Sequence, residues 1–326
     1  MVLVLEVKYG VGLWLFGQLQ DRFTVYHDAR TMEEKFERAS KVKGAQGLEV
    51  IYPAEFSDED IDEFKTLLKK HGFKVSGMIV DLFTKRKWVN GSLSSRDEKI
   101  RREAIELSKN ALDVAKEVGC ETVTLWLGHD GYDYPFQADY LRAWNNLSEG
   151  VREIASHRDD VRVALEYKLK EPRTHIFIGT VGKALMLAEE AGLSNVGVTM
   201  DFGHALYAFE NPSESIVLLH RKNKLFHVHF NDNYRDWDHD LIVSSINLWE
   251  SLEFFYWLRK IDYRGWISLD IYPYREDPVK MCQRCIENLN ILDKLINRIG
   301  VKRIEEAMNT GDSTTITATL MEVLDK

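Results

Sequence analysis

The sequence is poor in cysteine, which excludes one common way of stabilising a chain. Only Cys120, Cys282 and Cys285 occur among its 326 residues. A sparse and odd count argues against a disulfide framework and favours a reducing compartment, so we expect a cytoplasmic protein. Cys282 and Cys285 form a Cys-x-x-Cys pair, but no second pair lies near them. We interpret them as packing positions on one helix rather than as a redox or zinc site.

Long hydrophobic runs and an excess of basic residues are also missing. The apolar residues 1–5 are followed at once by Glu6 and Lys8, and no other run approaches the length of a membrane span. The chain has 43 Lys and Arg against 52 Asp and Glu, a formal net charge of -9. This sign opposes long-range attraction to nucleic-acid phosphate or to an anionic membrane. We therefore expect neither of them as a partner.

What the sequence does contain is a regular alternation of strand-like and helical stretches, without a linker or low-complexity tract. The predicted strands are 11–16, 47–52, 73–80, 121–127, 161–167, 196–201, 224–230 and 266–271, and the amphipathic stretches between them include 58–71, 95–118, 139–156, 179–192 and 247–261. Gly72 and Gly192 each end a helical stretch just before the next strand. Eight such units predict an α/β fold, a closed (β/α)8 TIM barrel over residues 1–300.

A doubly wound parallel sheet is the alternative fold. Against it, Gly10-Val-Gly12 does not extend to the full phosphate-binding fingerprint, and we expect no nucleotide cofactor. Residues 301–326 exceed what an eighth barrel helix needs and predict a C-terminal helical extension. This extension either packs on its own barrel or is donated to a neighbouring subunit. The second option is favoured, and it predicts a homo-oligomer, a dimer or a tetramer.

The stretch from Phe226 to Asp240 is the most distinctive chemically. Its first residues alternate apolar side chains with His227 and His229, which therefore project to the same side of a strand. The following loop holds four carboxylates and a further histidine, namely Asp232, Asp236, Asp238, Asp240 and His239. Carboxylates this close repel one another unless they are solvated, paired with bases or neutralised by a cation. Two histidines beside them favour a divalent cation over a solvated acidic loop.

Further ligand types fall at the ends of neighbouring predicted strands, where barrels of this kind build their active sites. They are Glu166 and Lys168 after strand five, Asp201 and His204 after strand six, His229 on strand seven, and Asp270 on strand eight. A single Asp after a strand is commonly a helix cap. Four successive strands that each deliver a carboxylate or an imidazole to one rim predict a metal site.

Aromatic side chains on the same rim have two interpretations. Trp126 on strand four is either barrel core or an apolar wall against a sugar ring, with His129 in the polar turn just beyond. Trp14 on strand one has the same two interpretations.

At this point several segments resemble a known family. Glu166-Tyr-Lys168-Leu-Lys-Glu171-Pro172 resembles the Glu-x-Lys-x-x-Glu-Pro segment of xylose isomerase and L-rhamnose isomerase, and Asp201-Phe-Gly-His204-Ala resembles the segment after their sixth strand. The loop from His229 through Asp238-His-Asp240 resembles that of L-rhamnose isomerase most. The resemblance runs from about residue 90 to 275 and is specific for the xylose-isomerase-like barrel superfamily.

The resemblance implies an aldose–ketose sugar isomerase that uses a 1,2-hydride shift on an open-chain sugar. It implies Glu166, Asp201, His229 and Asp270 as ligands of a first divalent metal, and His204, Asp238 and Asp240 as ligands of a second, catalytic one. The expected ion is Mn²⁺, with Co²⁺, Mg²⁺ and Zn²⁺ as alternatives. The expected catalytic residues are Lys168, Asp238 and His204, and the expected sugar-binding residues are Trp126, His129, Trp14, Tyr52 and Arg235. Tyr52 stands where xylose isomerase has its ring-opening histidine, so another group such as His129 opens the ring, or the sugar arrives open.

Three other functions compete with this one. A ketose 3-epimerase of the same superfamily shares Glu166, Asp201, His204 and His229, and Arg235 stands at the spacing of its substrate arginine. It moves a proton at C3 between two carboxylates, and it lacks a counterpart of Lys168. A metal-dependent nuclease uses the same barrel, but the net charge of -9 opposes it. The third alternative is a non-catalytic sugar-binding barrel.

Overall fold

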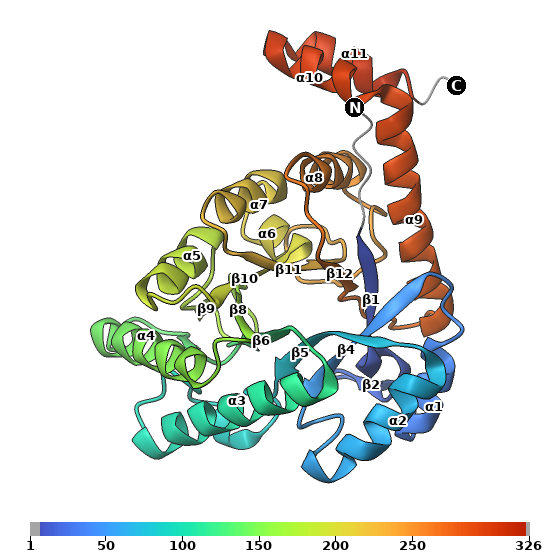
Figure 1. Ribbon diagram of the computed structural model, residues 1–326. Coiled ribbons are helices and arrows are strands. Elements are labelled where there is room, and N and C mark those ends of the chain that lie inside the picture. Colours follow the sequence, from blue (N-terminus) through green and yellow to red (C-terminus); the bar gives the residue numbers. More distant parts are fainter. Residues whose placement is uncertain (1–6, 324–326) are drawn as a thin grey trace.

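Eight parallel strands close into a barrel in the computed structural model, which describes residues 7–323. The strands are β1 (Lys8–Gly12), β4 (Ala45–Tyr52), β5 (Lys74–Val80), β6 (Thr122–Trp126), β8 (Arg162–Glu166), β10 (Val196–Asp201), β11 (Leu225–Phe230) and β12 (Trp266–Leu269). They follow one another around the ring in chain order, and β1 closes it by pairing with both β4 and β12. The predicted TIM barrel is confirmed (Figure 1).

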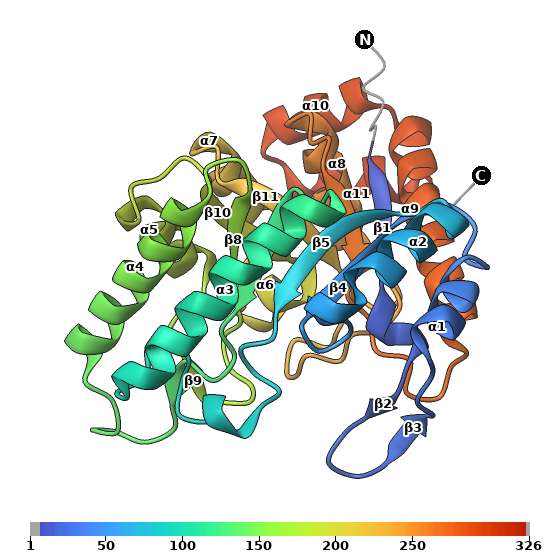
Figure 2. The ribbon, with the colours of Figure 1, turned by 60° about the horizontal axis from the view of Figure 1, so that its bottom comes forward.

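Helices surround this ring (Figure 1). They are α1 (Met32–Ala39), α2 (Ile61–His71), α3 (Glu98–Val118), α4 (Tyr140–His157), α5 (Val181–Glu190), α6 (Phe202–Tyr207), α7 (Pro212–Arg221), α8 (Leu248–Lys260), α9 (Pro278–Ile299), α10 (Val301–Thr310) and α11 (Ser313–Met321). Three short 3₁₀ segments complete the helical structure: η1 (Leu13–Phe16), η2 (Asp58–Asp60) and η3 (Arg86–Trp88). Two small antiparallel pairs lie outside the barrel sheet, β2 (Leu19–Gln20) with β3 (Val25–His27) and β7 (Gly131–Tyr132) with β9 (His175–Ile176). Figure 2 shows β2, β3 and β9 toward one end of the barrel.

The predicted first strand, 11–16, is wrong in its second half. The strand ends at Gly12, and Leu13–Phe16 turn into η1, where the N–H of Gly17 donates to the carbonyl oxygen of Trp14 at 3.0 Å. Leu13, Leu15 and Phe16 are buried in this turn. A run of six apolar residues is compatible with a buried strand or a buried helical turn, so its periodicity does not distinguish the two.

The barrel interior is more polar than the layer between the strands and the helices. Side chains alternate along a strand, so Leu48 and Val50 of β4 pack into the apolar layer while Glu49 projects inward. Other inward positions are also polar, among them Thr124, Thr199, His227 and Ser268, all buried. Thr124 Oγ1 and Thr199 Oγ1 hydrogen-bond at 2.9 Å across the interior. A polar interior leads up to the rim where the predicted ligands lie.

The C-terminal extension packs on its own barrel in this structure. Lys260 of α8 pairs with Glu305 of α10, and Trp257 of α8 lines one pocket together with Ile304 of α10 and Leu320 of α11. Cys282 and Cys285 are fully buried along α9, as expected for packing positions. The homo-oligomer and the domain boundary at residue 300 stay predictions. Within residues 7–323, no helix is long and apolar enough to cross a membrane.

An aromatic cluster under α2 gives a test of this packing. Phe64 is fully buried, stacked on Phe56 at 4.2 Å between ring centroids and edge-on to Phe36 at 5.6 Å. We expect Phe64→Ala to lower the free energy of unfolding by about 3–5 kcal/mol, because it removes the ring and leaves a cavity. Phe23→Ala is the control, because that ring is 75% exposed. Urea unfolding of both variants measures the difference, and equal losses would contradict the assigned packing.

Candidate metal centre

Four side chains from consecutive positions in the ring meet at the carboxyl ends of their strands. Glu166 ends β8, Asp201 ends β10, His229 lies in β11, and Asp270 follows β12 directly. Each offers one ligand atom, and these atoms all lie within 4.8 Å of one another. Glu166, Asp201 and His229 are buried, and the side chain of Asp270 is 25% exposed. The structure thus brings together the four residues predicted as ligands of a first metal.

One ring nitrogen of His229 is the centre of this arrangement. His229 Nδ1 lies 3.2 Å from Glu166 Oε1, 3.5 Å from Asp270 Oδ2 and 3.9 Å from Asp201 Oδ2. One imidazole nitrogen and three carboxylates form a ligand set that Mn²⁺, Co²⁺ and Zn²⁺ accept.

Local structure fixes the orientation of Asp201. It is the N-cap of α6, and its Oδ1 accepts a hydrogen bond from the backbone N–H of His204 at 2.7 Å. Its Oδ2 accepts from Asn231 Nδ2 at 3.1 Å, and the same amide donates to Asp240 Oδ1 at 3.3 Å. The carboxylate of Asp201 is therefore held in place by the first turn of α6 and by the residue that follows β11.

Negative charge is in excess among the buried side chains at this rim. Burial raises the pKa of Asp270 to about 7, with help from Glu166 and Asp201 and against the opposing effect of His229. Burial and the neighbouring carboxylates also raise the pKa of Asp201 and, far more, that of Asp240. Burial opposes protonation of His229, but the charges of Glu49 and Glu166 outweigh it and raise the pKa of this imidazole well above its usual range. Such a site favours a bound cation.

The three predicted catalytic residues form a second cluster beside the first. Lys168 Nζ lies 2.8 Å from Asp238 Oδ2 and 2.8 Å from Glu171 Oε2, and His204 Nε2 lies 3.1 Å from the same Asp238 oxygen. Burial opposes the charge on each partner, but the pair interactions prevail. The pKa of Asp238 is held far below its usual range, that of Lys168 is raised, and that of His204 is raised to about 9. His204 Nδ1 is 3.4 Å from Glu166 Oε1, which joins the two clusters.

The predicted second-metal set is not brought together as a ligand group. Two groups of possible ligands occur in the described part of the chain, and His204, Asp238 and Asp240 are not one of them. The reason is that Lys168 and His204 already neutralise the carboxylate of Asp238, whereas Asp240 is held by Asn231. A second metal at these residues stays a prediction that this arrangement does not support.

Three polar atoms at the rim nevertheless lack a hydrogen-bond partner among the residues described. They are His204 Nδ1, Asp238 Oδ1 and Asn231 Oδ1, all buried. Buried polar atoms are nearly always paired, so these three point to a polar group or ion that belongs beside them. The four converging side chains of Glu166, Asp201, His229 and Asp270 are the ligand types of a divalent cation, so the residues present fit one.

Of the predicted sugar-binding residues, Trp126 lies beside these clusters. It ends β6 and is partly exposed; Lys168 Nζ lies 5.4 Å from its ring centroid, and Phe83 packs edge-on at 4.7 Å. Trp14 lies in η1 against Gly12, at the carboxyl end of β1. Both positions border the rim, and the sugar contact itself stays a prediction.

The structure places the other three elsewhere. Tyr52 alternates with the inward Glu49, so it faces the helices, and its hydroxyl bonds Asp58 and Asn110. Arg235 forms an ion pair with Glu250 of α8. His129 lines a cavity of about 390 Å³ together with Arg142 and Arg173, a cavity that none of the four ligands lines. The side chain of Tyr52 points away from the rim, so its sugar contact stays a prediction that this arrangement does not support.

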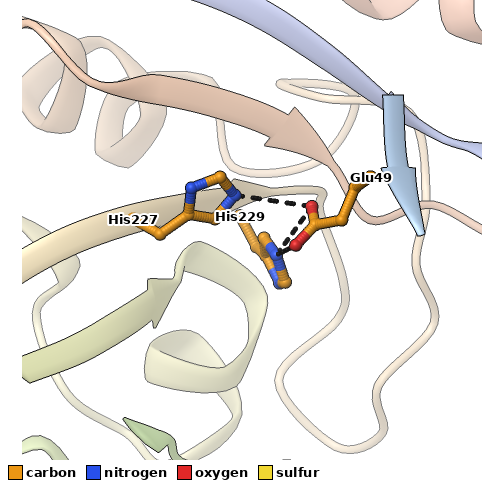
Figure 3. Close-up of side chains that lie close together, drawn as sticks. All are labelled: Glu49, His227 and His229. Atoms are coloured by element: carbon orange, nitrogen blue, oxygen red, sulfur yellow. Dashed lines mark hydrogen bonds and ion pairs between the residues drawn. The ribbon is translucent and has the colours of Figure 1, made fainter. Parts of the chain in front are cut away.

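Sequence reasoning missed Glu49. This carboxylate is fully buried and contacts both His227 and His229 from across the barrel (Figure 3). The only signal was one charged residue inside the apolar strand 47–52. A buried charge requires a partner, but sequence alone does not identify a partner 180 positions away.

A sequence profile described as the xylose isomerase-like TIM barrel matches residues 36–280, most of the chain. The chain belongs to the xylose isomerase-like TIM barrel family. Two similar proteins are xylose isomerases. The chain is 27% identical to that of Thermus thermophilus and 28% identical to that of Thermus caldophilus, each over 231 residues and 69% of this chain. The chain spans about 60% of the length of these relatives.

Comparison with solved structures agrees on the fold. A D-tagatose 3-epimerase-like protein aligns with a TM-score of 0.70 at 21% identity, covering 89% of this chain and 100% of its own. An L-ribulose 3-epimerase aligns with a TM-score of 0.70 at 15% identity, covering 90% and 96%. At these identities the similarity establishes the shared barrel and no more.

A first prediction concerns cation binding. In chelator-treated protein, Mn²⁺ at about 100 times its Kd should raise the free energy of unfolding by about 2.7 kcal/mol, seen as a rise in Tm. Asp201→Asn should abolish most of this rise, because it removes one charged ligand. Asp113→Asn is the matched control, since Asp113 pairs with His157 and Arg158 on the outer surface. An equal Mn²⁺-induced rise in Asp201→Asn would refute the ligand assignment.

A second prediction concerns pH in the metal-free protein. Because burial raises the pKa of Asp270 to about 7, its neutral form stabilises the fold at low pH. That contribution is lost as the pH rises from about 4 through 7. Asp270→Asn should therefore gain stability relative to wild type between pH 5 and pH 8, by about 2 kcal/mol. Urea unfolding at both pH values measures this, and a pH-independent difference would contradict the shifted pKa.

Proposed function

We propose that this chain is a divalent-metal-dependent enzyme that isomerises or epimerises a small sugar in its open-chain form. The observation that carries the proposal is the meeting of Glu166, Asp201, His229 and Asp270 at the carboxyl rim of a xylose isomerase-like barrel. A bound divalent cation would polarise two adjacent sugar oxygens and stabilise negative charge that develops on them. The cytoplasmic location remains a prediction.

The first candidate reaction is ketose 3-epimerisation. Solved proteins that share the fold are named as 3-epimerases of tagatose type, of allulose and of L-ribulose, and they support this candidate over an L-rhamnose-isomerase-like reaction. In the ring, β10 and β11 separate the strand of Glu166 from that of Asp270, so their carboxyl groups reach the centre from different sides. One carboxylate would take the proton from C3, and the other would return a proton to the opposite face.

The second candidate is aldose–ketose isomerisation, and one observation in this chain favours it. Lys168 is buried, with its ammonium group on Asp238 and 5.4 Å from the ring centroid of Trp126. A fixed cation at this place would steady a sugar carbonyl oxygen while hydride moves between C1 and C2. The curated relatives named xylose isomerase support the same candidate.

Label from solvent separates the two reactions. A panel of ketohexoses and ketopentoses is incubated with Mn²⁺-loaded protein in deuterated water and analysed by NMR. We expect the 3-epimer to form with deuterium at C3, because a proton leaves to a carboxylate and returns from an exchangeable pool. Formation of an aldose without solvent label would establish the second candidate instead. No conversion of any sugar by metal-loaded protein would overturn both.

Lys168→Met provides an independent test. If hydride transfer is the reaction, this variant should lose about 10²–10³ in kcat with little change in KM, because the charge acts on the transition state. If epimerisation is the reaction, kcat should stay close to wild type. Lys170→Met is the control, since Lys170 lies two residues on and rests over the ring of Tyr207. Equal losses in both variants would show an effect on folding rather than on chemistry.

A further inference from the structure

Glu49 is a buried carboxylate that the proposed reaction does not use. It lies on β4, on the far side of β1 from the metal-ligand strands, and it is fully buried inside the barrel. An ionised carboxylate in such a place is costly unless its partners compensate for the lost water. We therefore expect Glu49 to have a specific hydrogen-bonding or charged partner inside the barrel.

The carboxylate of Glu49 is directed at the ring of His229 (Figure 3). His229 Nε2 lies 3.0 Å from Glu49 Oε1 and 3.1 Å from Oε2, whereas His227 Nε2 lies 3.4 Å from Oε2. His227 has a nearer partner of its own, the hydroxyl of Ser268 at 3.0 Å. His229 is therefore the principal partner of Glu49.

The two nitrogens of His229 face different surroundings. Nε2 faces Glu49 inside the barrel, and Nδ1 faces Glu166, Asp201 and Asp270 at the rim. A neutral imidazole carries one proton, and a carboxylate can only accept a hydrogen bond. A proton on Nε2 satisfies Glu49 and leaves the lone pair of Nδ1 directed at the ligand group.

The backbone makes room for this contact. Gly77 of β5 is the register partner of Glu49, and a Cβ added there would lie 2.6 Å from Glu49 Oε1. Any larger residue at position 77 would push the carboxylate away from His229. The fit indicates a built contact rather than an accidental one.

A second cation held by Glu49, His227 and His229 is the competing explanation, since their ligand atoms also lie within 4.8 Å of one another. It would require His229 to give up protons at both nitrogens if Nδ1 binds an ion at the rim. The hydrogen bond to Glu49 needs no such step, so it is the simpler account.

We propose that Glu49 is a positioning residue, which fixes the tautomer and orientation of His229 so that Nδ1 is presented to a divalent cation at the rim. The inference rests on the proposed metal centre and is independent of which sugar reaction occurs there. Outer groups that orient a metal-bound histidine typically change metal affinity 10–100-fold.

Cobalt titration of the apo protein, followed by calorimetry and by the visible spectrum, tests the proposal. We expect Glu49→Ala to weaken Co²⁺ binding by about 10–100-fold. Glu49→Gln should lose less, because its amide oxygen still accepts from Nε2–H. The matched control is Glu55→Gln, which removes a carboxylate that is 6% exposed and paired with Lys35 away from the rim. Wild-type Co²⁺ affinity in folded Glu49→Ala would overturn the inference and leave the metal centre standing.

A measurement on the wild-type protein covers the case in which these variants do not fold. In ¹⁵N-histidine-labelled protein loaded with Zn²⁺, His229 should show a protonated Nε2 and a metal-bound Nδ1, with the signals that are missing from His229→Asn assigned to His229. Metal on Nε2 would overturn the inference. Failure of the wild type to bind Co²⁺ or Zn²⁺ at all would overturn the metal centre as well, so the two failures are distinguishable.

Discussion

Mutual repulsion among buried carboxylates is the constraint on which this structure depends. Glu166, Asp201 and Asp270 converge within a few ångströms of one another at the mouth of the barrel, where burial has removed most of the water that would screen them. His229 offsets part of this charge from below, and Lys168 with His204 offsets the charge of Asp238 alongside. Buried hydroxyl and imidazole groups along the barrel interior, among them Thr124, Thr199, His227 and Ser268, accompany this concentration of charge.

The two candidate reactions require much the same from this rim. Both require an open-chain sugar held by two oxygens, and both develop negative charge at the same place. They differ in the species that is transferred. Epimerisation transfers a proton between the sugar and two carboxylates, whereas isomerisation moves a hydride within the sugar. Glu166 and Asp270 meet the first need, while Lys168 meets the second. The choice between the reactions therefore depends on substrate orientation more than on the composition of the site.

Sequence patterns predicted the fold and the rim well where the information is local. The expected strands at 161–167, 196–201 and 224–230 match β8, β10 and β11 to within a residue at either end, because each is a short apolar run bounded by turns. The ligand residues followed from their places at strand ends. Partners distant in sequence were not predictable. The side chain of Tyr52 faces the helices and contacts Asn110, and the carboxylate of Asp238 is neutralised by Lys168. Glu49 contacts His229 only because the barrel closes.

The position of Glu49 in the ring has a consequence for how the molecule assembles. All four rim donors come from neighbouring strands, β8 to β12, and could gather in half a barrel, whereas Glu49 reaches His229 only once β1 has joined β4 to β12. The imidazole of His229 is thus aligned by a contact that depends on the pairing of β1 with β12. Tight binding of a metal ion would then require that the first and last strands of the barrel are paired. Metal binding would in this way be coupled to closure of the barrel.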